Sequence, residues 1–443
     1  MRDRLKKILN QDLGIWLTVV IIILVGIGTA NVGSATFYMN LHAGDWVGAH
    51  LVRHMAFVGV GGVTAAVVYG LVKSRWLHQD GVLYTLALVT LLLLLAVYLV
   101  GVKVNGARRW IPIGPLTFQP SEVAKFIAIM WSAKYLAVLR KQKRPIRLLG
   151  SLADGIRQLK GPFGTLRQRL TDAMWAEWKP ISLPLLFALA VIFQPDMGTA
   201  VLIVGFPIML YILAGLPRKE IVGTLAIVIL LGAALVAVAP YRLERLIAYY
   251  DPFRYAQDIG YQSVQSIIAV GSGGLLGQGF GRGHSKYAYL PEQYTDFAYS
   301  VWAQEAGFFL SLLVVVLFVA ILLLGWRMAM RTQDRYGRYC IYGLTAMLAG
   351  QGLYNIGMTI GIMPVTGVPL PFISFGGTSM VVCLTAVGTI LGIWQLTREK
   401  EERRERERRR EALTAGRPTG RRTDGRGGTY PRGDASAVTP PGA

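Results

Sequence analysis

Charged side chains are scarce in this chain, and those it has are mostly basic. Only 16% of the 443 residues are charged and 53% are hydrophobic, a balance too apolar for an ordinary soluble enzyme. Cysteine is almost absent, because Cys340 and Cys383 are the only two and no spacing pairs them. Neither a disulfide framework nor a metal site built on cysteine is therefore indicated.

Long apolar runs take the place of charge. About ten are long enough, or nearly so, to cross a hydrocarbon core, which takes about 20 residues of helix. They cover residues 13–33, 53–72, 82–102, 119–139, 181–194, 199–216, 220–239, 299–325, 339–361 and 377–396. The first run follows a basic start like that of a secretory signal, but it is long and has no convincing small-residue cleavage site, so we interpret it as retained. The expected fold class is an all-α polytopic membrane protein with about ten transmembrane helices.

The basic residues predict an orientation. Lys and Arg recur in every second predicted loop, as they do in cytoplasmic loops, so both termini are expected to be cytoplasmic. The predicted organisation is a cytoplasmic N-terminus (1–11), a membrane domain (12–397) and a basic, largely disordered cytoplasmic tail (398–443). The membrane domain includes a cytoplasmic basic insert (140–180) and one large extracytoplasmic loop (240–298).

The insert and the tail have plain interpretations. The insert carries ten Lys or Arg against three acids, with Leu and Ile at amphipathic spacing, which favours basic helices lying on anionic lipid headgroups. The tail composition predicts a charged helix followed by a disordered end rich in Gly, Pro and Arg. Membrane lipids are expected contacts. The tail's charge would also suit RNA, but a solvated tail is favoured and no nucleic-acid partner is expected.

Several cations fall on the side that this topology places outside. They are Lys103, Arg108, Arg109, Arg242, Arg245, Arg254, Arg282 and Lys286. Basic residues in that position oppose the insertion bias. One explanation is an anionic extracytoplasmic ligand, and the other is snorkelling of the side chains to the outer headgroups.

The predicted outer loop is unusually long and contains "GSGGLLGQGFGRG", with seven glycines in thirteen positions. A loop of this length in a compact fold is typical of a functional segment. Glycine lets backbone amides approach a phosphate closely, so a pyrophosphate cradle is one hypothesis. A flexible re-entrant connector explains the stretch about as well.

Two similar segments, "FQPSEVAKF" and "FQPDMGTA", bring ionisable groups to predicted helix ends. Glu122 and Lys125 are three positions apart and share a helix face. They form either a structural ion pair or a pair that orients substrate. Pro195 breaks one helix, and Asp196 is predicted to cap the next.

Two further acids occur in "YLPEQYTDFAYS", directly before an apolar run. Thr295 or Asp296 could cap the helix that follows. Alternatively, Asp296 could serve catalysis, and the residues alone divide these interpretations evenly. Glu292 is predicted to shape the loop.

Five motifs together resemble one family. They are "GARRWIPIGPLTFQPSEVAKF", "FQPDMGTA", "GYQSVQSIIAVGSGGLLGQGFGRG", "YLPEQYTDFAYSVWAQEAG" and "NIGMTIGIMPVTGVPLPFISFGGTSM", in order between about residues 10 and 397. In these the chain is similar to the SEDS proteins, the group of RodA, FtsW and SpoVE. The resemblance implies a ten-helix inner-membrane glycosyltransferase with an outward-facing site that polymerises lipid II into peptidoglycan. It also implies a class B penicillin-binding protein as partner, within the elongation or division complex.

The resemblance assigns residues as well. It makes Asp296, in the Thr-Asp-Phe motif, the catalytic residue. The predicted substrate-binding residues are Arg109, Glu122, Lys125, Lys286, Glu305 and Ser374. Three positions depart from the family's usual pattern: Gln304 replaces an acid, Tyr294 a His, and Phe375 a Tyr. These departures weigh against a proton relay through Tyr294 or Gln304.

The resemblance also leads to expectations about the subtype and the reaction chemistry. "NIGM" with "PVTGVPLP" slightly favours the RodA type, since the proteobacterial FtsW pattern tends to carry Lys in place of Thr366. A carboxylate such as Asp296 would take the proton of the acceptor hydroxyl. Arg109 would stabilise the leaving pyrophosphate, and Mg²⁺ or Mn²⁺ bridging Asp296 and pyrophosphate is the alternative. Two other functions stay open, a transporter or flippase of polyprenyl-linked precursors and a structural scaffold.

Overall fold

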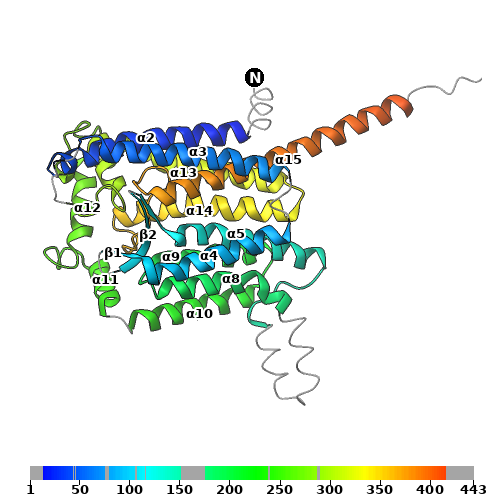
Figure 1. Ribbon diagram of the computed structural model, residues 1–443, viewed down its shortest axis with the longest axis horizontal. Helices are drawn as coiled ribbons and strands as arrows, with labels where there is room; N and C mark the ends of the chain where they lie inside the picture. Colours follow the sequence, from blue (N-terminus) through cyan, green and yellow to red (C-terminus); the bar gives the residue numbers. More distant parts are fainter. Residues whose placement is uncertain are drawn as a thin grey trace, which may run out of the picture. The chain divides into compact units, whose positions relative to one another are not determined.

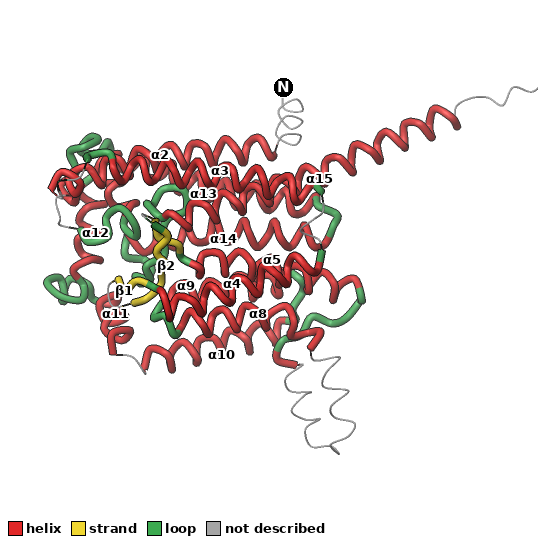
Figure 2. The backbone as a smooth tube through the Cα atoms, viewed as in Figure 1, coloured by secondary structure: helices red, strands yellow, loops and turns green. Residues whose placement is uncertain are grey.

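The computed structural model is built from long helices packed side by side (Figures 1 and 2). It describes residues 13–42, 44, 46–74, 79–104, 107–114, 116–150, 175–237, 240–286 and 290–415. Within these residues a helix covers most of each of the ten predicted ranges. The helices are α2 (Leu13–His42), α3 (Ala49–Lys73), α4 (Asp80–Val100), α5 (Pro120–Lys141), α8 (Trp175–Ile192), α9 (Met197–Leu213), α10 (Arg218–Ala237), α13 (Ala298–Arg331), α14 (Arg335–Thr359) and α15 (Gly377–Ala415). The predicted helical fold class is confirmed.

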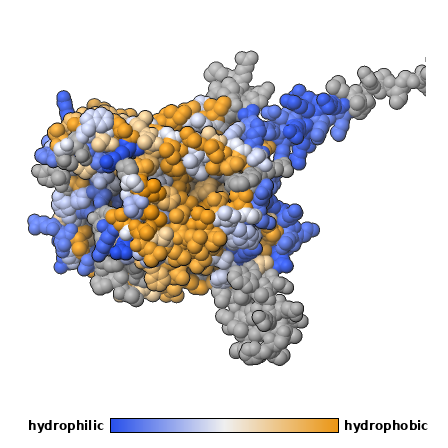
Figure 3. Space-filling view, viewed as in Figure 1, coloured by the Kyte–Doolittle hydropathy of each residue, from blue (hydrophilic) through white to orange (hydrophobic). Residues whose placement is uncertain are grey.

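Five helices, α2, α3, α4, α13 and α15, are long and apolar enough to cross a membrane by length and composition alone. Helix α9 is a shorter apolar helix. Figure 3 shows a broad hydrophobic surface over the middle of the helices, with hydrophilic residues gathered toward their ends. An exposed apolar surface of this breadth is typical of contact with lipid. The number of spans and their orientation stay predictions.

Helix α5 lies at the centre of the helical packing. Nearly every residue from Pro120 to Leu139 is buried, and the helix packs against α4, α8, α9 and α14. Small residues such as Ala124, Ala128 and Ala133 are completely buried and let neighbouring helices approach closely. The charged residues near the start of α5 are therefore enclosed by protein.

A small sheet interrupts the helices and was not predicted. Strands β1 (Val102–Val104), β2 (Ala107–Ile113) and β3 (Leu116–Phe118) pair antiparallel in the order β1-β2-β3. Asn-Gly and Gly-Pro steps lie between these strands in the sequence and are hairpin signals. The strands are so short that the apolar runs on either side dominated the prediction.

The loops separate to opposite ends of the helices. Helices α11 (Pro240–Tyr250) and α12 (Tyr261–Ser272) lie with the sheet at one end, on the left of Figure 1. Helix α5 ends and α8 begins at the other end. The predicted topology requires this separation, although which end faces outward stays a prediction. Residues 151–174 of the basic insert lie outside the described residues.

The chain divides into two compact units, residues 1–398 and 399–443. The described part of the second unit, residues 399–415, is helical and is the last part of α15. Acidic and basic side chains are interspersed along it, as predicted for a charged helical extension. Residues 416–443, where the tail was predicted to be disordered, lie outside the described residues.

Candidate active site

Asp296 lies in a turn that leads into α13. Glu292 has a positive φ of 53° there, and its carbonyl oxygen accepts hydrogen bonds from the backbone N–H groups of Thr295 and Phe297, both at 3.2 Å. The Glu292 carboxylate accepts a further bond from the Thr295 hydroxyl at 2.8 Å. Glu292 therefore shapes the turn, as predicted from the sequence.

The structure places neither Thr295 nor Asp296 at the N-cap position of α13. Phe297 occupies the N-cap position, and it makes no side-chain cap bond. The Thr295 hydroxyl bonds Glu292 instead. The turn closes around Glu292, so α13 begins two residues after Asp296.

The loop after α14 holds this turn in place. The Ser374 hydroxyl donates to the carbonyl oxygen of Thr295 and accepts from the N–H of Leu370 at 2.9 Å. The N–H of Phe375 donates to the carbonyl oxygen of Tyr294 at 2.8 Å. Ser374 is buried and bonds only backbone groups here, so this predicted substrate-binding residue fixes the loop against the turn.

The Asp296 carboxylate lies against the same loop. A Cβ atom built on Gly367 would come within 3.4 Å of Asp296 Oδ2. Gly367 has a φ of 72°, a conformation that favours glycine. Glycine at this position therefore both allows the turn of the loop and leaves space beside the carboxylate.

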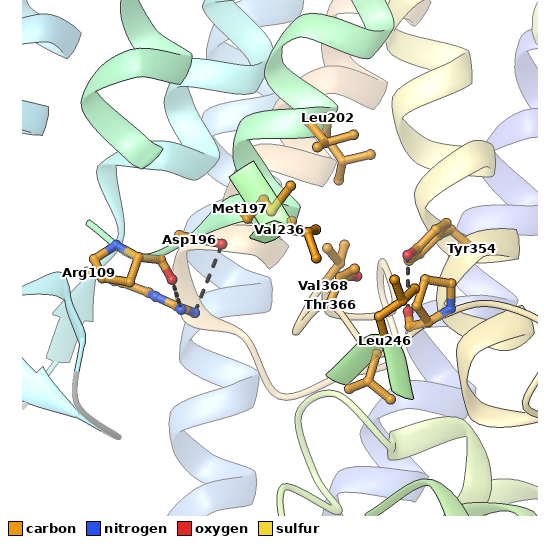
Figure 4. Close-up of a pocket in the computed structure, with 14 residues that line it drawn as sticks. Arg109, Asp196, Met197, Leu202, Val236, Leu246, Tyr354, Thr366 and Val368 are labelled. Atoms are coloured by element: carbon orange, nitrogen blue, oxygen red, sulfur yellow. Dashed lines mark hydrogen bonds and ion pairs between the residues drawn. The ribbon is translucent and has the colours of Figure 1, made fainter. Parts of the chain in front are cut away.

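The neighbours of Gly367 form part of the wall of a cavity of about 270 Å³. Thr366 and Val368 line it together with residues of α9, α10, α11 and α14. Most of the wall is apolar, including Leu202 and Val236, while Arg109 and Asp196 lie at one side (Figure 4). Ligand pockets commonly have this composition, apolar walls with a few placed polar groups, although typical volumes begin near about 300 Å³.

Arg109 is the cation at this cavity. Its guanidinium donates to the carbonyl oxygen of Pro195, and Nη1 lies 4.0 Å from Asp196 Oδ1 (Figure 4). The side chain keeps 23% of its surface exposed, and its buried Nε has no hydrogen-bond partner. Strand β2 thus presents a guanidinium that is fixed at one edge and has donors left for an anionic ligand.

Asp196 is the N-cap of α9, as predicted. Its Oδ1 accepts from the N–H of Thr199 at 3.3 Å. Its Oδ2 lies 3.5 Å from Nε2 of Gln119, the residue before α5. The carboxylate is 2% exposed and connects the starts of two helices beside the cavity.

Glu122 and Lys125 form a buried ion pair at 2.8 Å, and neither lines the cavity. Lys125 Nζ also donates to Gln351 Oε1 at 2.9 Å, which joins α5 to α14. Of the two interpretations left open by the sequence, these contacts favour the structural ion pair. A role in substrate binding stays untested.

Glu305 and Gln304 lie further along α13 and hold the glycine-rich stretch. Both Glu305 carboxylate oxygens accept from the Ser34 hydroxyl, at 2.8 and 2.7 Å. Gln304 Oε1 accepts from the N–H and the hydroxyl of Ser285, at 3.0 and 2.6 Å. Glu305, another predicted substrate-binding residue, therefore contacts α2 and the loop and does not line the cavity.

The glycines of this stretch serve close backbone packing. A Cβ on Gly277 would lie 2.1 Å from the carbonyl oxygen of Glu305, and one on Gly307 would lie 2.2 Å from the N atom of Gly277. Gly307 has non-helical dihedral angles and kinks α13 at this contact. None of these glycines lines the cavity, so the contacts favour the connector over the pyrophosphate cradle.

Of the other cations predicted to lie outside, none whose side chain is described lines the cavity. Arg108, Arg254 and Arg282 are exposed, and Arg109 is the only Lys or Arg that lines the cavity within the described part of the chain. The Lys286 side chain, predicted to bind substrate, lies outside the described residues, as do those of Arg242 and Arg245. Within the described residues, no group of three or more His, Cys, Asp or Glu could hold a metal ion.

The sequence analysis named Tyr294 and Phe375 but missed His50, which packs beside them. Tyr294 packs against Phe375 and against His50 of α3, with ring centroids 5.9 and 5.7 Å apart. Burial, and then the Glu292 carboxylate, raise the pKa of Tyr294 above its ordinary value, so this phenol stays protonated at neutral pH. Gln351 and Asn355 were also missed. Their signal was a pair of polar residues four positions apart inside an apolar helix.

Comparison with known proteins identifies the family. The model of the FtsW/RodA/SpoVE family, described as cell cycle proteins, matches residues 15–399. The chain belongs to this family. It is 32% identical over 388 residues to a probable peptidoglycan glycosyltransferase FtsW of Thiomicrospira cyclica, covering 86% of this chain and 92% of that protein. It is also 32% identical over 383 residues to stage V sporulation protein E of Bacillus subtilis, covering 86% and 97%.

Solved structures agree with this assignment. A chain of a peptidoglycan synthase complex that coordinates polymerization and crosslinking matches with a TM-score of 0.65 and 27% identity, over 86% of this chain and 97% of that one. The rod shape determining protein RodA of Thermus thermophilus matches with a TM-score of 0.55 and 27% identity, over 86% and 95%. The chain is therefore a multi-pass membrane protein. Relatives of the FtsW, SpoVE and RodA types all match, so the preference for the RodA type stays a prediction.

Proposed function

We propose that this chain polymerises peptidoglycan glycan strands. It transfers the growing lipid-linked glycan onto the 4-hydroxyl group of lipid II and releases undecaprenyl pyrophosphate. One observation carries the proposal: the Asp296 carboxylate lies against Gly367, whose two neighbours line a cavity with Arg109 at its edge. An acid and a cation beside one apolar cavity are the groups that this transfer needs.

Asp296 acts as the general base. It takes the proton from the acceptor's 4-hydroxyl group as the oxygen bonds to the anomeric carbon of the donor. The bond from that carbon to the pyrophosphate oxygen breaks, and its electron pair leaves with undecaprenyl pyrophosphate. A single displacement inverts the α-linked donor into a β-1,4 product, so no enzyme nucleophile is required.

Arg109 stabilises the leaving group. A guanidinium carries several N–H donors in a plane, a geometry that suits phosphate oxygens. Pro195 holds one edge of Arg109, and the unpartnered Nε leaves bonding capacity on the side chain. A divalent cation on the pyrophosphate, the alternative that the sequence left open, would add positive charge, and no step here depends on it.

The cavity holds only part of the substrate. With about 270 Å³ it is too small for a disaccharide-peptide with its polyprenyl chain, but its apolar wall suits the segment next to pyrophosphate. The site is proposed to face outward from the bacterial inner membrane, because the basic loops favour a cytoplasmic position for the opposite end. The proposed partner is a class B penicillin-binding protein, since a structural relative belongs to a complex for polymerization and crosslinking.

The test is polymerisation of labelled lipid II by the purified protein, with and without the penicillin-binding partner, in the presence of Mn²⁺. Wild type is expected to form glycan polymer, and Asp296→Asn is expected to lose at least about 100-fold in rate, since a general base contributes about 10²- to 10⁴-fold. Asp258→Asn is the matched control, because Asp258 is an exposed acid of the outer loop, and it is expected to keep the wild-type rate.

Two outcomes would contradict the proposal. Polymer formed by Asp296→Asn at the wild-type rate would remove Asp296 as the base. Movement of precursor across vesicles by the wild-type protein, with no polymer under any condition, would favour a flippase.

A further inference from the structure

We infer that Asn355 is a positioning residue that sets the Asp296 carboxylate in register with the cavity wall. The inference rests on the proposed function, because it concerns the placement of the proposed base. Asn355 lies in α14 and is completely buried between the Asp296 turn and the loop that follows the helix.

One side-chain amide joins the two segments. Asn355 Nδ2 donates to the carbonyl oxygen of Asp296 at 2.8 Å and to that of Val368 at 2.7 Å. A side-chain NH₂ group has two donors, so both are used. Because both partners are acceptors, only the nitrogen of the amide can face them, which fixes the orientation of the side chain.

Both bonds end next to the proposed chemistry. The carbonyl group of Asp296 belongs to the residue whose carboxylate lies at Gly367, and Val368 lines the cavity. Asn355 therefore holds two backbone segments together through one nitrogen atom. One segment carries Asp296, and the other forms the cavity wall at Val368. The buried Asn355 Oδ1 has no hydrogen-bond partner, and leaving a buried acceptor without a partner costs free energy. The advantage of Asn at this position therefore lies in the two bonds that its Nδ2 donates.

A second amide on the same face of α14 supports the loop. Gln351 lies one turn before Asn355, and its Nε2 donates to the carbonyl oxygen of Pro369 at 2.9 Å. Its Oε1 accepts from Lys125, which is paired with Glu122. The buried ion pair of α5 thus orients Gln351, and α14 holds two consecutive carbonyl groups of the loop.

The test compares variants of one helix in the full chain. Asn355→Asp keeps the shape but removes both amide donors, and Gln351→Leu removes the second support. The matched control is Thr345→Val, a nearly isosteric change in the same helix at a buried residue whose Oγ1 has no hydrogen-bond partner. The readouts are kcat and KM for lipid II, the melting temperature, and hydrogen exchange of the amides in residues 290–297 and 364–369.

The expected result is a loss confined to turnover. Misplacing a catalytic group by about 1 Å can cost up to about 100-fold, so Asn355→Asp is expected to lower kcat at least about 10-fold while KM changes less than about 2-fold. Gln351→Leu is expected to lower kcat less. Exchange in both segments should quicken in Asn355→Asp, whereas Thr345→Val should match wild type in every readout.

Each other outcome has a defined meaning. Wild-type kcat and exchange in a folded Asn355→Asp protein would overturn the inference while wild-type polymerisation leaves the proposed function intact. If Asn355→Asp does not fold, Asn355→Ser is measured in its place, and wild-type kcat and exchange there would overturn the inference equally. Absence of polymer from wild type, together with faster exchange in the variant, would refute the proposed function and leave the contact standing.

Discussion

Two loops pack beside carboxylates at the start of α13, the loop after α14 beside Asp296 and the glycine-rich stretch beside Glu305, yet the surroundings of the two acids differ. Glu305 is 2% exposed, and its oxygens accept from the Ser34 hydroxyl while the glycine-rich stretch packs against its backbone. Asp296 is half-buried, and its carboxylate lies at a glycine whose neighbours line a cavity. The first region is closed by protein, whereas the second borders space for a ligand.

The difference separates two residues that the family resemblance had assigned to one site. A carboxylate enclosed by donors and close backbone contributes to packing, because its capacity for bonding is used within the protein. A carboxylate beside a cavity can meet a substrate proton. We therefore expect substitutions in the Asp296 region to change turnover and those in the Glu305 region to change stability.

The largest effect on the cavity side, after loss of Asp296 itself, is expected for Arg109→Ala. It removes the guanidinium at the cavity edge, and kcat/KM for lipid II polymerisation should fall about 100-fold, the lower end of the loss for a single charge-stabilising donor. The matched control is Arg108→Ala, because the neighbouring Arg108 is exposed and donates to the carbonyl oxygen of Tyr98 at 3.1 Å. Equal losses in the two variants would mean that general surface charge, not the cavity, determines the rate.

A smaller effect is expected from a methyl group beside the base. Gly367→Ala and Gly274→Ala both place a side chain at positive φ, 72° and 56°, which costs about 1–2 kcal/mol each. Only the Cβ at Gly367 approaches Asp296 Oδ2, whereas nothing lies within 4 Å of one at Gly274. Both variants should melt at lower temperature, but only Gly367→Ala should lower kcat, by several-fold. A similar fall in kcat for Gly367→Ala and Gly274→Ala would mean that the two regions do not differ in their effect on turnover.

The smallest effect on turnover is expected for Glu305→Gln. The change keeps the shape but alters the bonds to Ser34, so unfolding free energy should fall by about 1–3 kcal/mol while kcat stays within about threefold of wild type. Thermal melting and lipid II polymerisation are measured on the same preparation, with Ser34→Ala as the partner variant. Loss of polymerisation with an unchanged melting temperature would mean that Glu305, like Asp296, acts in turnover, and would contradict the proposed difference between the two regions.

Local patterns predicted some contacts and not others. Glu122 and Lys125 pair as their spacing on one helix indicates, and Asp196 caps α9 because a helix starts directly after it. The same rule predicted the start of α13 at Thr295 or Asp296, whereas Phe297 occupies the N-cap position after a turn that Glu292 closes. The short sheet and the helices of the outer loop were missed because neither carries a long apolar run.

The helices follow from the amino-acid sequence, because the length of an apolar run decides whether a helix can be buried in lipid, and the motifs indicate the family. Tertiary structure decided what the polar residues do. Asn355 contacts Asp296 and Val368 only because α14 packs between the turn and the loop, and Arg109 reaches the cavity only because β2 lies beside the start of α9. Such contacts require several segments that are distant in the sequence to lie together. The spacing of residues within one segment does not contain that information.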